Sequence, residues 1–300
     1  ARPPPLLPGD LLSPPQRLPP PPHRPGPAAF VFNFAIPGLL FRTLARQGAP
    51  DASALRLLVA YYVPALLVFA GGFALARAAR ADARTSVVSA RGSSYGNCAL
   101  LGMPLVLGAY GEAGATPFFL LLAVHGPLLM SLTAVCFETL DGAGQGVAGL
   151  LRQTARGLIQ NPIVVAIVAG SLYGASGLGL APMVDDTLAM LGRAAVPCAL
   201  FALGASLSRY GFAGRPGLTS ASTVLKMAAL PAMVWLAGAW LGLSQLDRGV
   251  ATLTAAMPTG VNVFLFAERY RADLSLASSN VVVATAAAVP SLTLCLWLLR

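Results

Sequence analysis

Two short stretches decide the fold: GNCALLGMP at residues 96–104 and AMPTGVN at residues 256–262. Each combines Pro, Gly and Asn within a long apolar part of the chain. Proline removes a backbone hydrogen bond, and glycine lets the chain leave helical geometry. We therefore expect two apolar helices that are each broken near the middle, with the ends of the half-helices facing one another.

The composition around these stretches is that of a membrane protein. Of the 300 residues, 56% are hydrophobic and only 10% are charged, whereas soluble domains carry about 25% charged residues. Long apolar runs are interpreted as helices that cross a bilayer. The sequence thus predicts an all-α polytopic membrane protein. Nine apolar segments are expected at 30–47, 55–77, 86–110, 115–139, 158–178, 187–208, 220–243, 248–267 and 274–299.

The formal net charge of +9 does not indicate nucleic-acid binding, because the basic residues are spread over short loops rather than gathered with aromatic residues on one polar face. Successive loops between membrane helices lie on opposite sides of the membrane. One side then receives most of the arginines of the loops, namely Arg77, Arg80, Arg84, Arg152, Arg156, Arg209, Arg215, Arg269 and Arg271. The other side receives Asp51, Glu112, Asp185, Asp186 and Asp247. The positive-inside rule makes the first side cytoplasmic. Nineteen of the twenty basic residues are Arg, which indicates a GC-rich bacterial genome and hence the bacterial inner membrane.

The two halves of the chain resemble each other. AIPGLLF at 35–41 recurs as AVPCALF at 195–201, and the Met-Pro pair at 103–104 recurs at 257–258. Matches in the same order at nearly constant spacing indicate a duplication. With five helices in each repeat, the halves insert with opposite orientation, which is the inverted-repeat architecture of many secondary transporters.

The domain organisation follows from this repeat. We expect repeat one at 29–140 with helices 2–5, a short cytoplasmic connection at 141–157, and repeat two at 158–300 with helices 6–10. The broken helices are then the fourth and the ninth, and the first helix is missing. In its place, residues 1–28 hold 12 of the 25 prolines. This arm is either disordered or the product of a frameshift or misplaced start that replaced helix 1.

The matched breaks are the expected binding site, because transporters of this architecture bind substrate where the helices are interrupted. Amide groups at a half-helix N-terminus carry partial positive charge and receive a carboxylate without a charged side chain. The alternative is that each Asn bonds across a helix interface and each Pro makes an ordinary kink. The candidate substrate-binding residues are Asn97, Gly102, Pro104, Pro258, Thr259, Gly260 and Asn262.

Four ionisable residues lie in or near apolar segments. His125 either carries protons or is a neutral imidazole bonded to a neighbouring helix, and the neutral form is favoured. Arg91 and Arg193 either neutralise an anionic substrate or snorkel to the cytoplasmic surface, and snorkelling is favoured for Arg91. Lys226, the sole lysine, is interpreted as a topology anchor.

Enzyme chemistry is not expected. The sequence places no paired carboxylates in one span, no Gly-rich loop with a nucleotide-binding lysine and no His cluster for a metal. No cofactor or metal is therefore predicted. A symporter or antiporter coupled to Na⁺ or H⁺ is the main alternative to a plain anion transporter, although the matched helices hold no deep acidic residue. A passive channel is a further alternative, but it would need polar periodicity along whole helices.

Residues 97–104, 161–162, 195–204 and 257–262 together resemble the auxin efflux carrier family. The resemblance covers about residues 30–300 and implies ten helices that cross at prolines near the substrate, with Pro104 and Pro258 at the crossing. It also implies transport of a small organic anion by alternating access. Plant members carry a long loop between the halves and export auxin, whereas bacterial members without it are described as malate or other dicarboxylate carriers. The expected partners are a small carboxylate and the lipid bilayer, with a homodimer left open.

Overall fold

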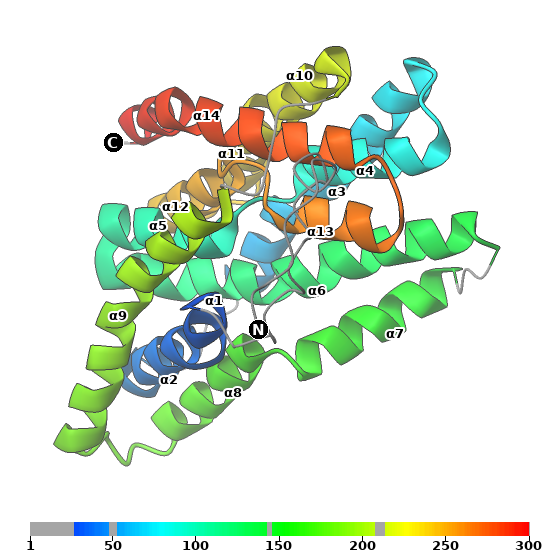
Figure 1. Cartoon of the computed structure of the whole chain (residues 1–300). Helices are drawn as coiled ribbons and strands as arrows, with labels where there is room; N and C mark the ends of the chain where they lie inside the picture. Colours follow the sequence, from blue (N-terminus) through cyan, green and yellow to red (C-terminus); the bar gives the residue numbers. More distant parts are fainter. Residues whose placement is uncertain (1–26, 48–52, 143–145, 208–213, 300) are drawn as a thin grey trace, which may run out of the picture.

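In the computed structural model the chain is an assembly of helices (Figure 1). Within the described residues there is no strand, and an isolated antiparallel bridge joins Gly96 to Thr259. Nearly all of the proline-rich arm falls on residues outside this description, although helix α1 already begins at Pro27. The structure describes residues 27–47, 53–142, 146–207 and 214–299.

The helices of the first half follow the expected segments closely. One of them, expected at 86–110, is interrupted after Ser94 and resumes at Cys98. The elements are α1 (Pro27–Phe30), the π-turn η1 (Val31–Ala35), α2 (Ile36–Gln47), α3 (Ser53–Ala78), α4 (Ala83–Ser94), the π-turn η2 (Cys98–Gly102), α5 (Met103–Tyr110), the 3₁₀ turn η3 (Gly111–Gly114) and α6 (Ala115–Leu140).

The second half repeats this order, with a second interruption between Ala255 and Asn262. An Asn161 side chain caps the helix that opens this half by accepting a hydrogen bond from the amide of Ile163 at 2.9 Å. The elements are α8 (Pro162–Ala175), α9 (Pro182–Leu207), α10 (Pro216–Val224), the π-turn η4 (Leu225–Ala229), α11 (Leu230–Trp240), α12 (Gln245–Ala255), α13 (Asn262–Arg269) and α14 (Leu274–Leu298).

The expected connection at 141–157 is itself largely helical. Helix α7 (Gly146–Ile159) packs against α6, and it meets α8 at a bend of 60°. The bend falls at Asn161, because the residue before a proline is disfavoured in helical geometry and Pro162 starts a new helix. The apolar segment expected from residue 158 thus begins as a helix four residues later.

Three prolines inside apolar segments are each preceded by a π-turn. Pro37, Pro104 and Pro231 are the second residues after η1, η2 and η4. A proline lacks the amide hydrogen and its ring collides with the preceding turn, and a wider π-turn relieves both problems without ending the helix. These prolines therefore sit within continuing helices.

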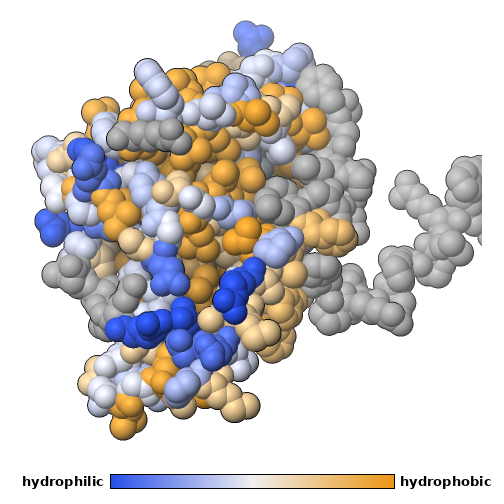
Figure 2. All heavy atoms as spheres, turned by 90° about the vertical axis from the view of Figure 1, so that its left-hand side faces the viewer, coloured by the Kyte–Doolittle hydropathy of each residue, from blue (hydrophilic) through white to orange (hydrophobic). Residues whose placement is uncertain are grey.

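The surface and the helix lengths are those of a multi-pass membrane protein. Large apolar side chains such as Leu67, Leu172 and Trp240 are exposed, and hydrophobic residues cover much of one face between small hydrophilic groups (Figure 2). Among the described residues, four helical stretches are long and apolar enough to cross a membrane, and the bent pair α7–α8 makes up to five. Exposed apolar surface of this kind needs lipid around it.

The helices form two groups. Helix α2 packs against α8 and α9, and these three lie together at the lower left of Figure 1. The second group packs α3 against α4 and α11, and α14 against α10 and α13. Helix α6 contacts members of both groups. The two broken helices belong to the second group and face the first.

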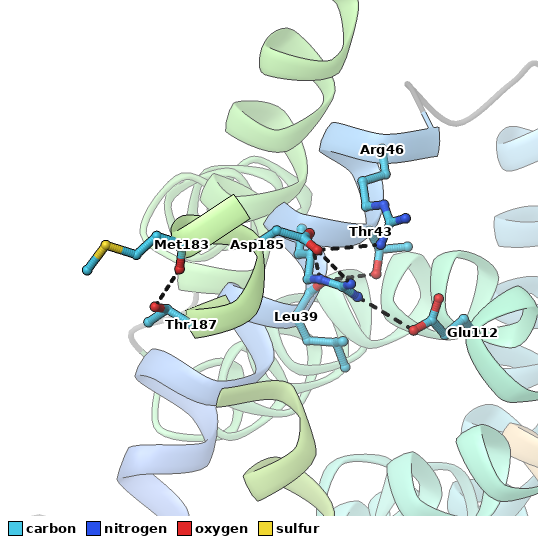
Figure 3. Close-up of polar contacts among 8 residues, drawn as sticks. Leu39, Thr43, Arg46, Glu112, Met183, Asp185 and Thr187 are labelled. Carbon is cyan, nitrogen blue, oxygen red and sulfur yellow. Dashed lines mark hydrogen bonds and ion pairs between the residues drawn. The ribbon is translucent and has the colours of Figure 1, made fainter. Parts of the chain in front are cut away.

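Charged residues gather at one end of the first group. The Arg42 guanidinium donates to both carboxylate oxygens of Asp185, at 2.8 and 3.0 Å, and so ties α2 to α9. Glu112 lies 3.6 Å from Arg42, and Arg46 lies 3.7 Å from Asp185 (Figure 3). Glu112 and Asp185 thus share one end of the molecule, as the assignment of loops predicts.

Candidate functional site

The first break exposes the start of a half-helix. Helix α4 ends at Ser94, and Tyr95 has the extended backbone angles φ −87° and ψ 112°. The chain turns at Asn97 and re-enters a helix at Cys98. The Asn97 carbonyl accepts from the amides of Leu101 and Gly102, at 3.3 and 3.1 Å. The amides of the first residues of this half-helix have no partner within the helix.

The second break pairs with the first through the backbone. The amide of Asn97 donates to the carbonyl of Pro258 at 2.7 Å, and the amide of Gly260 donates to the carbonyl of Tyr95 at 3.0 Å. The hydroxyl of Thr259 donates to the carbonyl of Gly92 at 2.8 Å. The two interrupted helices are thus joined where neither could satisfy its own backbone groups.

A cavity of about 410 Å³ adjoins this junction, a size typical of sites for small molecules. It is lined by both breaks, by α6, and by η1 and α8 of the first group of helices, so it lies at the boundary between the two groups. None of the described lining residues is an Asp, Glu, Lys or Arg. They are Phe32, Tyr95, Gly96, Asn97, Cys98, Ala99, Leu100, Leu122, His125, Gly126, Met130, Asn161, Ile163, Gly260, Val261, Asn262 and Leu265.

The N-termini of two half-helices border this cavity. Cys98, Ala99 and Leu100 start the first, and Asn262 starts the second. The amides at a helix start carry partial positive charge, and the aligned peptide dipoles favour a bound anion. With side-chain amides at Asn97 and Asn262, the cavity offers hydrogen-bond donors and positive potential without a formal charge.

The His125 side chain is a structural part of the first break. Its Nε2 accepts a hydrogen bond from the amide of Gly96 at 3.2 Å, so this nitrogen carries no proton. The ring packs 4.7 Å from that of Tyr95 and 5.9 Å from that of Tyr61, measured between centroids. The ring is thus bonded to a neighbouring segment and lies against the cavity, whereas its neutral state stays a prediction.

Behind the cavity lies a buried arginine, which corrects an expectation. Arg91 is 1% exposed and does not snorkel. Its Nη1 donates to the hydroxyl of Thr133 at 2.8 Å and to the carbonyl of Leu129 at 3.1 Å. The guanidinium also lies over the rings of Tyr95 and Phe266, 4.4 and 4.0 Å from their centroids. Helices α6, α13 and α14 pack against α4, so the Arg91 side chain cannot reach the membrane surface. Its contacts with Thr133, Leu129 and the two rings stabilise the charge inside the protein.

Tyr95 links this arginine to the cavity. Its hydroxyl accepts a hydrogen bond from the Nδ2 of Asn262 at 3.0 Å. Tyr95 was not among the expected binding residues, and Arg91 was expected to snorkel rather than to neutralise a substrate. An aromatic residue before Gly96-Asn97 gives no distinguishing signal in an apolar sequence.

Of the remaining expected residues, Gly102 packs against the second break, whereas Pro104 and Arg193 lie away from the cavity. Because Gly102 has no side chain, the backbone there packs closely against Met257. A Cβ added at Gly102 would lie 3.3 Å from the Cγ of Met257. Pro104 does not stand at the crossing, because the π-turn before it keeps the helix continuous, and it lines a separate hollow beside Tyr110. Arg193 is exposed on α9 and does not line the cavity.

Two further residues differ from their sequence interpretation. Asn161, which the sequence marked only through the resemblance to the auxin efflux carriers, lines the cavity, and its Nδ2 donates to the carbonyl of Ala123 at 3.2 Å. The Asn-Pro pair before an apolar run was the sequence signal that could have identified Asn161.

Lys226 is fully buried rather than a topology anchor at the membrane surface. The residues around it in the sequence do not distinguish a buried lysine from one at the surface.

Comparison with known proteins agrees with the resemblance in the sequence. A family model described as "Membrane transport protein" matches residues 9–296. The chain is 26% identical over 281 residues to a "Putative malonate transporter" of Rhizobium meliloti (strain 1021), covering 90% of this chain and 85% of that protein. It is also 27% identical over 152 residues to "Auxin efflux carrier component 8" of Arabidopsis thaliana, covering 49% of this chain and 41% of that protein. The chain therefore belongs to the membrane transport protein family, that of the auxin efflux carriers, and is a membrane transporter rather than an enzyme.

Proposed function

We propose that this chain transports a small dicarboxylate, of the malonate or malate class, across the bacterial inner membrane. The observation that carries the proposal is the cavity at the crossing, where two half-helix N-termini and the amides of Asn97 and Asn262 meet without any lining carboxylate among the described residues. Such a site favours an anion. The bacterial relative whose name refers to malonate supports this class of substrate.

We propose alternating access as the mechanism. The cavity lies between the two groups of helices, so that a rocking of the group with both broken helices against α2, α8 and α9 would open it to either side. The same order of elements surrounds each break. This similarity supports the proposal that the two halves are inverted repeats, the architecture on which alternating access relies. Pro64 and Pro127 of the first half also have counterparts in Pro231 and Pro290.

Uptake of labelled malonate and malate into proteoliposomes tests the proposal. Replacing Asn97 or Asn262 with Ala removes one amide from the cavity and should lower uptake about tenfold each, the effect of one hydrogen bond to a charged group. Asn33→Ala is the matched control, because that exposed amide donates only to the carbonyl of Ala29 among its described contacts. Folded protein that takes up neither anion, or equal losses in all three variants, would refute the proposed substrate class.

A further inference from the structure

The ammonium group of Lys226 lies between the two helix breaks. Its side chain is 0% exposed and extends from the π-turn η4. Nζ donates to the carbonyl of Ala255, the last residue of α12, at 2.5 Å. On its other side it lies against Gly96, where an added Cβ would be 3.4 Å from both Cε and Nζ. A single ammonium therefore contacts the end of one half-helix and the break in the other.

The ammonium of Lys226 satisfies a carbonyl group at the end of α12 that accepts from no backbone amide among the described residues. The carbonyl of Thr252 accepts from the amide of Ala256 at 2.9 Å, and that of Thr254 accepts from the amide of Met257 at 3.3 Å. The carbonyl of Ala255 faces Lys226 instead. The C-terminal end of a helix carries partial negative charge, so a cation is favoured there. In transporters with broken helices, such ends coordinate the coupling Na⁺ or H⁺.

Among the residues that the structure describes, no carboxylate forms an ion pair with Lys226. The five ion pairs among the described residues all use arginines, and no described group of three or more His, Cys, Asp and Glu residues could hold a metal ion. The titratable groups nearest this end are the Cys98 thiol and the His125 imidazole, which are 3.7 Å apart, with the buried Arg91 beyond Tyr95. A buried charge without a carboxylate partner is costly, so its retention indicates a function.

We propose that Lys226 is a tethered cation that occupies the place of a coupling cation at the crossing, so that this transporter needs no free Na⁺ or K⁺. The ammonium neutralises the negative end of α12 and adds positive potential behind Gly96, whose other side borders the cavity. This inference rests on the proposed anion transport, which it extends by naming the group that takes the place of a free cation at the helix breaks.

Chemical rescue tests the tethered cation without relying on transport. In Lys226→Ala the full chain loses the ammonium and most of the stem, and its melting temperature in detergent should fall by about 5 °C or more. Added propylammonium should restore most of this loss and leave the unaltered chain unchanged, whereas neutral propanol should not. Equal rescue by propanol, or no rescue by either, would overturn the proposal. If the alanine variant does not fold, Lys226→Met keeps the stem without the charge, and uptake equal to that of the unaltered chain would refute the proposal.

Transport provides the second readout. Uptake of labelled malonate by the unaltered chain should be the same when N-methylglucamine replaces Na⁺ and K⁺, and uptake by Lys226→Met should fall at least about tenfold. Uptake that requires Na⁺ would show that a free cation binds as well, against the proposal. Absence of any uptake together with rescue by propylammonium would refute the proposed substrate while leaving Lys226 as the cation of the crossing.

Discussion

The backbone amide of Asn97 donates to the carbonyl oxygen of Pro258 at 2.7 Å, across 161 residues of sequence. This bond and its neighbour between Gly260 and Tyr95 replace the helical bonds that both interrupted helices lose. Backbone groups inside a membrane must be paired within the protein, since no water is present to replace the partner. Each break is therefore stable only because the other lies beside it.

Gly260→Ala should disrupt this junction. An added Cβ would lie 2.9 Å from Cδ1 of Tyr95 and 3.0 Å from the carbonyl oxygen of Gly96, so the two breaks would have to separate. We expect a loss of roughly 2 kcal/mol in the free energy of unfolding, as for overpacking in a core, and little remaining uptake. Gly71→Ala is the control, because nothing lies within 4 Å of its added Cβ. Thermal unfolding in detergent measures both, and equal melting temperatures would contradict the account.

Tyr95→Phe should change the orientation of an amide without removing it. The Tyr95 hydroxyl accepts from Nδ2 of Asn262, and its loss frees that amide to rotate in the cavity. We expect KM for the transported anion to rise about fivefold, the effect of one weakened hydrogen bond, with little change in melting temperature. Tyr173→Phe serves as control, because its hydroxyl donates to the carbonyl of Gly179 far from the cavity. A change in maximal rate with KM unaltered would argue against positioning.

The breaks were predictable from the sequence, and the buried cations were not. Pro, Gly and Asn inside apolar runs are visible signals, and both GNCALLGMP and AMPTGVN indeed interrupt helices. A single Arg91 or Lys226 in an apolar helix looks the same whether it snorkels or is enclosed. What decides its place is which helices cover that side, and this is a property of the packed structure. The prediction that the helices cross at Pro104 was wrong, because a π-turn before this proline lets the helix continue through it. The sequence does not show that such a turn will form.

Arg91→Leu should be strongly destabilising, since the guanidinium is enclosed. The substitution removes hydrogen bonds to the hydroxyl of Thr133 and the carbonyl of Leu129, and the stacking on Tyr95 and Phe266. Hydrogen bonds from charged groups contribute about 1.5–3 kcal/mol each, so a loss of about 3 kcal/mol in the free energy of unfolding is expected. Arg193→Leu, at an exposed arginine of α9, should change it by less than about 0.5 kcal/mol. Comparable losses in the two variants would place Arg91 at the surface after all.

The acid stability of the protein should depend on the Asp82 carboxylate, which begins α4 and thus supports the half-helix that leads into the crossing. It accepts from the backbone amide of Thr85 at 2.9 Å and from its hydroxyl at 2.7 Å. These bonds hold the pKa of Asp82 below its ordinary value of 3.8, with the backbone amide as the main cause.

A carboxyl whose pKa is lower in the folded chain stabilises that chain above the unfolded pKa, and this stability is lost as the pH falls through the folded value. Asp82→Ala should therefore lower the free energy of unfolding by about 1 kcal/mol at pH 7, the usual effect of removing such a cap. The difference should shrink as the pH falls below about 4, where the carboxyl of the unfolded chain takes up a proton, and on through the lower pKa of the folded chain. Asp186→Ala, at an exposed carboxyl of α9, provides the comparison. A difference for Asp82 that stays constant between pH 7 and pH 3 would show that the cap acts without its charge.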